Sequence, residues 1–597
     1  MATFSLLLFT AATLVQGSKY GENHVAVGSD SQIVEQRAFP APNVTLYSPA
    51  FAPNASFAPG WTKGSEGATS QADLDAFLQS FAQKNAAWAS YGNADFLSEE
   101  GNFFPYVHLA SSSNSTSKVR VWIQGSVHGN EPAGDEATLA LLGAMDADPS
   151  WAAGFLEKLD IIVLPRYNPD GNGYFQRTLA TNFDPNRDHT KLARQQTRDI
   201  KQWFSQFSPH IAIDMHEYGA RSRYAGNYSN AADGMYSAAK NLNIHPAVRK
   251  LSETVFAPAI GASMESKGLR GEPYMTASRS ANPIRLDEAG TDAKIGRNAM
   301  GLTQSITFLF ETRGIGIASQ SFKRRTLAGL QMILGVLETA RDQAETVYGT
   351  IEGAIEDLIA SQEPIVVTDY TTYSNRTWTM VDTRNGDIVQ IPVEFASTTP
   401  ATPNRTVVRP EGYVIPRAWH DLAERLRVSG VEVETLLEGF QGNVEVYNIT
   451  SSSLGRSYYE AVKPNLFTEH AWTGYISTRG DWRSVYHGIG GRNLRDVASA
   501  KMTNQTKIEG DAVVVDQVVR FRVVETLFNG DFVLQSNYFH TRDGMYTLRM
   551  LAEHRTGRLS TGSRNGINTP FGIIYGIEPG SWLWLWKAEW STENTVT

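Results

Sequence analysis

His128 and Glu131 stand three residues apart in the segment GSVHGNEPAG, directly after a predicted strand. A loop in that position can turn an imidazole nitrogen and a carboxylate oxygen toward one point, and both atoms are good metal ligands. With 12 histidines and 62 acidic residues among 597, a His-x-x-acid pattern is expected about once by chance. A surface histidine beside a surface glutamate is therefore the simpler interpretation of this pair taken alone.

Two further predicted strands end in residues that would complete a metal site. The run IAIDMH ends in His216, and the run SITFLFE ends in Glu311. In open α/β sheets, sites form beyond the carboxyl ends of the strands. A carboxylate after so apolar a run is costly unless it is paired, solvated by a cleft or close to a cation. Asp214 shares a strand face with His216 and is a candidate to support it, whereas Glu217 should face the opposite side.

Ordinary structural roles remain open for these residues. Glu311 could form an ion pair with Arg313 or a neighbouring lysine or arginine at the rim of the sheet, and His216 could be a satisfied core histidine. The absence of cysteine limits any metal site to histidine nitrogen and carboxylate oxygen, and it also excludes disulfides.

The segment LPRYNPDGNGYFQRTLATNFDPNRDH, residues 164–189, makes the interpretation specific. With it, the chain resembles the zinc metallocarboxypeptidase family, the carboxypeptidase A-like enzymes. The family pattern runs His-x-x-Glu, Asn-Pro-Asp-Gly, an Arg, Asp-x-Asn-Arg and a His after a strand. This chain has the same order over about residues 70–345: HGNE from His128, NPDG from Asn168, Arg177, DPNR from Asp184, and DMH ending at His216.

The resemblance implies a zinc enzyme that hydrolyses the C-terminal peptide bond of peptides or proteins. It implies that one Zn²⁺ per chain is bound by His128, Glu131 and His216. Asp184 would hold the imidazole of His128, and Glu311 would be the general base and acid. Two neutral imidazoles and one carboxylate leave an open position on the metal, where the pKa of a water falls to ~7.

The resemblance also implies residues that handle the substrate. Arg177, with Arg166 as its rival, would polarise the scissile carbonyl, a contribution typically worth ~3 kcal/mol. Asn186 and Arg187 would bind the terminal carboxylate, for which a guanidinium is well shaped. Tyr274 is the candidate for the family's mobile-loop tyrosine.

Four residues remain without a firm role. Asp287, Glu288 and Asp292 could make the side-chain pocket selective for basic residues, although polar loop positions are the simpler interpretation. His189 follows the DPNR motif, and we expect it in the first turn of a helix, in a surface or capping role.

The order of predicted elements indicates an α/β fold in the first part of the chain. Predicted strands cover 119–124, 161–164, 211–216 and 305–311, and predicted helices cover 71–89, 134–145 and 188–207. Apolar strands between helices predict a mixed, largely parallel twisted sheet with helices on both faces, as in a carboxypeptidase-like fold.

After about residue 363 the sequence becomes β-rich. Hairpins are predicted at Asn385–Gly386 and Asn529–Gly530, a βαβ-like piece at 413–436, and a buried strand around Trp582 to Trp586. We expect a signal peptide at 1–17, an extended N-terminal or pro-segment at 18–65, a catalytic domain at 66–362, and a C-terminal region of one or two subdomains at 363–597.

Composition and charge narrow the cellular setting. The net charge of −9 and the lack of a basic stripe disfavour nucleic acid as a partner. The apolar run near the N-terminus is too short to span a bilayer but suits a signal peptide, so we expect a secreted protein that does not sit in a membrane. Eight Asn-x-Ser/Thr sequons suggest a glycoprotein: Asn43, Asn54, Asn114, Asn227, Asn375, Asn404, Asn448 and Asn504.

Alternatives to a secreted carboxypeptidase remain. An amidase or deacylase on the same scaffold, acting on cell-wall peptides or N-acyl amino acids, would use the same ligands. A non-catalytic binding scaffold and a sugar-binding protein that uses the C-terminal aromatics are further alternatives.

Overall fold

The computed structural model describes residues 27–51, 67–111, 118–277, 283–410, 412–435, 441–454, 465–477 and 483–486. The chain divides into two compact units, of which the first covers 1–446 and 471–531 and the second covers 447–470 and 532–597. The predicted signal peptide, the hairpin at Asn529–Gly530 and the tryptophan strand lie outside the described residues.

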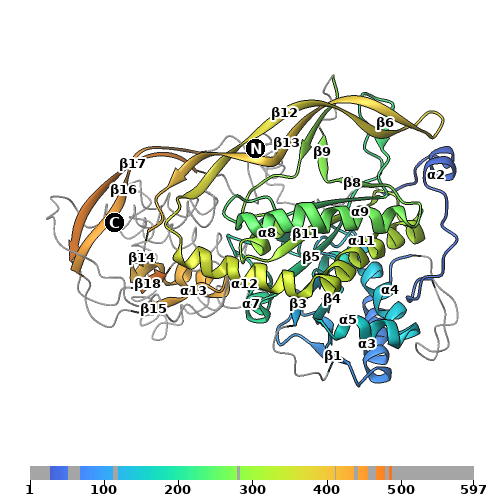
Figure 1. Cartoon of the computed structure of the whole chain (residues 1–597), viewed down its shortest axis with the longest axis horizontal. Coiled ribbons are helices and arrows are strands. Elements are labelled where there is room, and N and C mark those ends of the chain that lie inside the picture. Colours follow the sequence, from blue (N-terminus) through green and yellow to red (C-terminus); the bar gives the residue numbers. More distant parts are fainter. Residues whose placement is uncertain are drawn as a thin grey trace, which may run out of the picture. The chain divides into compact units, whose positions relative to one another are not determined.

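An eight-stranded sheet in the order β1-β2-β4-β3-β5-β11-β7-β8 forms the centre of the first unit (Figure 1). Its four central strands, β4, β3, β5 and β11, are parallel to one another, whereas β2 and β7 run antiparallel to their central neighbours. The strands are β1 Ala89–Asn93, β2 Pro105–Leu109, β3 Val119–Gln124, β4 Leu159–Leu164, β5 Ile211–Gly219, β7 Gly234–Ala238, β8 Gly271–Pro273 and β11 Ile306–Ile315.

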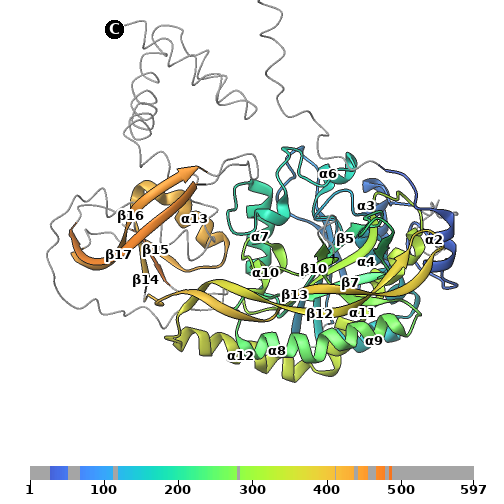
Figure 2. The same ribbon diagram turned by 90° about the horizontal axis from the view of Figure 1, so that it is seen from above.

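Both faces of this sheet are covered, because alternate residues of each strand point to opposite sides. Val121, Ile213 and Phe308 belong to a core shared with α3 (Gln71–Lys84), α4 (Ala133–Ala147), α9 (Ala257–Glu265) and α11 (Phe322–Asp342). Trp122 and Ala212 belong to a second core shared with α7 (Gln195–Phe207) and α10 (Gly296–Gly301). Figure 2 shows α7 and α11 on opposite sides of the sheet. The expected mixed, largely parallel sheet with helices on both faces is confirmed.

The helices of this α/β part follow the strands along the chain. They are α2 Gln32–Ala38, α3 Gln71–Lys84, α4 Ala133–Ala147, α5 Pro149–Leu156, α6 Pro169–Gly173, η1 Pro185–Arg187, α7 Gln195–Phe207, α8 Pro246–Leu251, η2 Ser252–Phe256, α9 Ala257–Glu265, α10 Gly296–Gly301, α11 Phe322–Asp342 and α12 Ala344–Ala360. In the described part of the chain, every helix falls short of the length and apolar character that crossing a bilayer requires.

The predicted helix over 188–207 begins seven residues too early. The carboxylate of Asp188 accepts hydrogen bonds from the backbone amides of Ala193 and Arg194 at 2.8 and 2.9 Å. Leu192 has a left-handed backbone conformation with φ of 50°. Asp188 thus holds the following residues as a loop, and the helix begins only at Gln195.

The predicted hairpin at Asn385–Gly386 is present as two long strands, β12 Ile365–Asp382 and β13 Asp387–Val407. They lie in a five-stranded sheet of order β6-β12-β13-β10-β9, whose other strands come from residues before 363. These strands are β6 Tyr228–Asn230, β9 Met275–Ala277 and β10 Arg285–Glu288. One sheet therefore crosses the expected boundary between the catalytic domain and the β-rich region.

The βαβ-like piece is also present. Strands β14 Gly412–Ile415 and β15 Val433–Thr435 both run antiparallel to β18 Arg483–Tyr486, and η3 Arg417–Trp419 and α13 His420–Val428 connect them. Strands β16 Gln441–Leu454 and β17 Asn465–Ser477 form a two-stranded sheet.

The segment expected to be extended contains the short helix α2 and is packed into the fold. Val34 and Ala38 are fully buried against Ala231 and Val381. Asp30, at 6% exposure, pairs with the buried guanidinium of Arg313 on β11. Residues 27–51 are therefore integrated with the sheet that positions the candidate site.

Candidate metal centre

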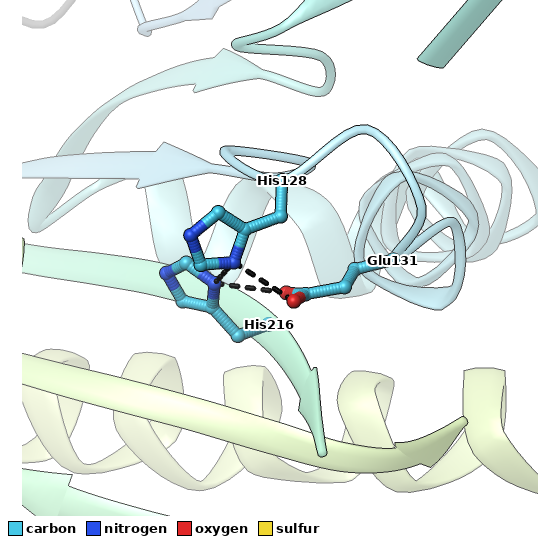
Figure 3. A group of neighbouring side chains, drawn as sticks. All are labelled: His128, Glu131 and His216. Carbon is cyan, nitrogen blue, oxygen red and sulfur yellow. Dashed lines mark hydrogen bonds and ion pairs between the residues drawn. The ribbon is translucent and has the colours of Figure 1, made fainter. Parts of the chain in front are cut away.

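His128, Glu131 and His216 meet at the carboxyl ends of β3 and β5 (Figure 3). His128 and Glu131 lie in the turn between β3 and α4, and His216 lies on β5. The turn is tight, because a Cβ on Gly129 would lie 1.9 Å from the carbonyl carbon of Gly171. Glycine at position 129 thus lets the turn pack closely against the NPDG segment.

The ligand atoms of these three residues face one another. His128 Nδ1 lies 2.8 Å from Glu131 Oε1, His216 Nδ1 lies 2.9 Å from Glu131 Oε2, and the two Nδ1 atoms are 3.0 Å apart. All three side chains are buried. Figure 3 shows the two rings on one side of the carboxylate.

Carboxylates behind the rings determine which nitrogens face the centre. Asp184 Oδ1 lies 3.1 Å from His128 Nε2, and Asp214 Oδ2 lies 3.1 Å from His216 Nε2. A carboxylate in that position favours the hydrogen on Nε2 and leaves the Nδ1 lone pair facing inward. Asp214 is held in turn by Gln124, whose Nε2 donates to it at 2.9 Å and whose Oε1 accepts from Trp122 at 2.9 Å.

Two imidazole lone pairs and a buried carboxylate that point at one another repel unless a cation lies between them. A set of two histidine nitrogens and one carboxylate fits Zn²⁺, which takes such ligands with a fourth position left for water or substrate. Burial alone would lower the pKa of His216, but Asp214 and Glu131 raise that pKa well above its ordinary value. A metal would compete with that proton, so binding it should release one.

Glu311 lies beside this cluster because β11 pairs with β5 in a register that places Glu311 opposite His216. Its side chain is buried, and burial, followed by the charge of Glu131, raises its pKa to about 8. Within the described residues no lysine or arginine forms an ion pair with it. The alternative partner Arg313 instead pairs with Asp30, which removes the ordinary structural explanation for Glu311.

Arg177 and its rival Arg166 lie in different places. Arg177 Nε donates to Asp184 at 2.9 Å, and its Nη1 lies 3.5 Å from Glu131. Arg166 is 1% exposed and is tied to Asp135 at 2.7 Å and to the carbonyl of Thr69 at 2.8 Å. The structure thus brings Arg177 to the cluster and encloses Arg166 in the core.

A cavity of about 370 Å³ opens from the cluster. Six residues to which the resemblance gives a role in the site line it: His128, Arg177, Asn186, Arg187, Tyr274 and Glu311. The amide of Asn186 is oriented by the backbone N–H of Gly296, which donates to its Oδ1 at 2.7 Å, while its Nδ2 lies 3.3 Å from His216 Nε2.

The three acidic residues between 287 and 292 do not leave a free negative charge in the cavity. Asp287 pairs with Arg285 at 2.9 Å and is not among the lining residues, nor is Asp292. Glu288 does line the cavity, but its Oε1 lies 3.1 Å from Lys240 and its Oε2 accepts from the amide of Thr398 at 2.8 Å.

The prediction of a surface or capping role for His189 is wrong. His189 precedes α7, is 5% exposed, and has no hydrogen-bond partner for Nε2 in the described structure. Burial lowers its pKa to about 4. It packs behind the site, where a Cβ on Gly296 would lie 2.9 Å from His189 Nε2 and 3.0 Å from Asp214 Oδ2.

Two residues around the site were not anticipated from the sequence. Gln124 had a usable signal, because it is a polar residue at the end of an apolar strand, as Glu311 is. Arg297 lines the cavity at 2% exposure, but no motif or spacing in its loop distinguishes it.

Comparison with known proteins gives a consistent set of relatives. The model of the zinc carboxypeptidase family matches residues 75–255, which include His128, Glu131 and His216. Carboxypeptidase 2 of Trichophyton rubrum is 50% identical over 457 residues, covering 75% of this chain and 85% of that protein. Probable carboxypeptidase 2 of Arthroderma benhamiae is 50% identical over 453 residues, covering 74% and 86%. A solved metallo-carboxypeptidase from Burkholderia cenocepacia is 16% identical, with a TM-score of 0.36 over 46% of this chain and 70% of that one.

Proposed function

This chain belongs to the zinc carboxypeptidase family and is a metallo-exopeptidase, and from that premise we propose that it releases the C-terminal residue of peptides or proteins with Glu311 moving the protons. The observation that carries the proposal is the register of β5 and β11, which sets Glu311 beside His216 and its two partner ligands. His128, Glu131 and His216 would hold one Zn²⁺, which when bound lowers the pKa of water and polarises a carbonyl.

Side chains of the protein carry out proton transfer and stabilise the developing oxyanion. Glu311 accepts a proton from the attacking water and later gives it to the leaving amine. Burial and the charge of Glu131 raise the pKa of Glu311 to about 8 before a metal binds, and a nearby cation would lower it toward the range in which one group both takes up and releases a proton near neutral pH. Arg177, with the Asp184 carboxylate 2.9 Å from its Nε, provides fixed positive charge for the oxyanion that develops on the scissile carbonyl.

Arg187 and Asn186 orient the substrate by its end. The guanidinium of Arg187 is half-buried at the cavity, where its Nη1 donates to the carbonyl of Asn186 at 2.9 Å and it forms no ion pair among the described residues. A terminal carboxylate would supply that partner through two parallel hydrogen bonds. Tyr274, also on the cavity wall, is the candidate to close over the bound residue.

The test compares peptides that differ only at the C-terminus. The purified enzyme should trim a peptide with a free carboxylate and leave its C-terminally amidated form intact. Equal cleavage of both forms would instead favour the amidase or deacylase that the same scaffold could support. Glu311→Gln should keep its metal and lose several orders of magnitude in kcat. Glu356→Gln, at an exposed position on α12, should behave like the wild type.

We also propose that the protein is secreted and glycosylated. Four of the sequon asparagines lie in described parts of the chain outside β16, and all four are exposed, as glycan attachment requires: Asn43, Asn227, Asn375 and Asn404. Enzymatic removal of N-glycans from protein collected from culture medium should lower its mass. Protein that is found only in the cells, with no change in mass, would refute this.

A further inference from the structure

Arg297 stands apart from the other buried arginines. It lies on α10, is 2% exposed and lines the cavity. Its Nη2 donates to the carbonyl of Gly290, and its Nε has no hydrogen-bond partner. Within the described residues no aspartate or glutamate forms an ion pair with it.

Arg297 differs in this respect from every other buried arginine in the described structure. The other buried arginines all have a carboxylate partner: Arg166 with Asp135, Arg313 with Asp30, Arg324 with Asp233, Arg325 with Glu217, and Arg425 with Asp421. An uncompensated buried charge is strongly unfavourable, and a bound ligand could supply the counter-charge that Arg297 lacks.

Besides the carboxyl of Glu311, two cations without an ion-pair partner line the described part of the cavity. Glu217 and Glu288 are neutralised by Arg325 and Lys240. Arg177 is paired with Asp184. The cationic side chains left without an ion-pair partner on the described cavity wall are Arg187 and Arg297.

The terminal carboxylate of a substrate neutralises only one of these two cations. Under the proposed function that carboxylate binds Arg187, so Arg297 keeps an unmatched charge unless the bound residue brings a second anion. Burial and the nearby charge of Arg187 disfavour the charged form of Arg297, whereas Tyr274, Asp214 and Glu311 favour it without forming an ion pair with it.

We propose that Arg297 binds an acidic side chain, so that this enzyme preferentially releases C-terminal glutamate or aspartate. The inference rests on the proposed function and names its substrate class. The planar guanidinium matches a carboxylate through two parallel hydrogen bonds. Met235, Leu309 and Ile315 on the same cavity wall provide apolar surface for the methylene groups of the side chain. This preference is the opposite of the selectivity for basic residues that Asp287, Glu288 and Asp292 could have given.

The experiment uses the full-length, zinc-loaded enzyme and three peptides that differ only in the last residue, which is Glu, Gln or Leu. Glutamine has nearly the same shape as glutamate without the charge, so the pair isolates the charge. We expect kcat/KM for the Glu peptide to exceed that for the Gln peptide by about 10- to 100-fold, the range for hydrogen bonds to charged groups. Equal values would overturn the inference.

Variants at position 297 test whether Arg297 causes the preference for glutamate. Arg297→Met should abolish the preference for Glu over Gln, mainly through KM, and should raise the relative rate on the Leu peptide. Arg297→Lys should restore part of it. Arg384→Met removes an arginine whose side chain is 63% exposed on the β12–β13 turn, and this control should leave all three rates unchanged.

Other outcomes identify what has failed. If Arg297→Met lowers kcat/KM equally for all three peptides, Arg297 binds the terminal carboxylate and the inference is wrong. If the wild type trims the peptides without a preference for Glu, the inference fails and the proposed function stands. If it trims none of these or any other free peptide, the proposed function itself fails. Should Arg297→Met not fold, product inhibition of the wild type by free glutamate but not by glutamine supports the inference, and equal inhibition refutes it.

Discussion

Acidification should destabilise the fold through His189. The side chain is buried behind the metal cluster, its Nε2 has no partner among the described residues, and burial lowers its pKa from 6.5 to about 4. In the unfolded chain the imidazole has its ordinary pKa, so between those two values the unfolded state binds a proton that the folded state does not. Stability is therefore complete above pH 6.5 and decreases as the pH falls toward 4.

The size of the effect follows from the gap between the two pKa values. The full difference corresponds to about 3 kcal/mol, of which about 2 kcal/mol is lost between pH 7 and pH 5. Little screening is expected, because His189 is 5% exposed.

Denaturant unfolding at pH 7 and pH 5 measures this change in unfolding free energy. Zinc is removed from every sample, so that loss of metal does not contribute. His189→Gln should reduce the difference in unfolding free energy between the two pH values by about 2 kcal/mol relative to the wild type. His420→Gln, at an exposed position at the start of α13, is the matched control and should not change it. An identical pH dependence in His189→Gln and the wild type would show that His189 is not buried as a neutral ring.

Three further substitutions test the construction of the site. Asp214→Asn removes the carboxylate 3.1 Å from His216 Nε2 and should weaken zinc binding by about 10- to 100-fold in a chelator competition, whereas unchanged affinity would deny Asp214 its supporting role. Gly129→Ala places a Cβ 1.9 Å from the backbone of Gly171 and should abolish zinc binding; Gly173→Ala, which meets nothing within 4 Å, is the control, and equal zinc content in both would contradict the tight turn. Asp30→Ala leaves the buried charge of Arg313 without this partner and should lower the unfolding free energy by about 3–5 kcal/mol, so a near-normal denaturation midpoint would refute the pair.

The metal cluster could be predicted because its information is local. HGNE is a short motif after a strand, and His216 and Glu311 each end an apolar run. Parallel strands bring their carboxyl ends to one edge of a sheet, so residues about 90 positions apart meet without any detailed knowledge of the packing. The alternation along β5 likewise placed Asp214 with His216, as the 3.1 Å separation bears out.

The environments of His189 and Arg297 depend on tertiary contacts that produce no periodic pattern in the sequence. The apolar spacing of 188–207 continues a helical pattern, but the carboxylate of Asp188 captures two backbone amides and stops the helix from beginning there. Arg297 is set apart only by the absence of a carboxylate partner, and that can be recognised only after every nearby carboxylate has been located.

The packing of the N-terminal segment could not be predicted from its sequence either, and this packing has a functional consequence. Its Pro- and Ala-rich sequence has no period and indicates an extended arm or pro-segment, yet it satisfies groups that the sheet buries. Asp30 neutralises Arg313, two residues after Glu311 on β11, and the backbone N–H of Ala50 donates to Glu136 Oε1 at 3.1 Å. A cut that removed residues 27–51 would leave Arg313 without its carboxylate next to the proposed general base. Such processing should therefore inactivate the enzyme rather than activate it, because the charge of Arg313 would stay buried without the carboxylate of Asp30.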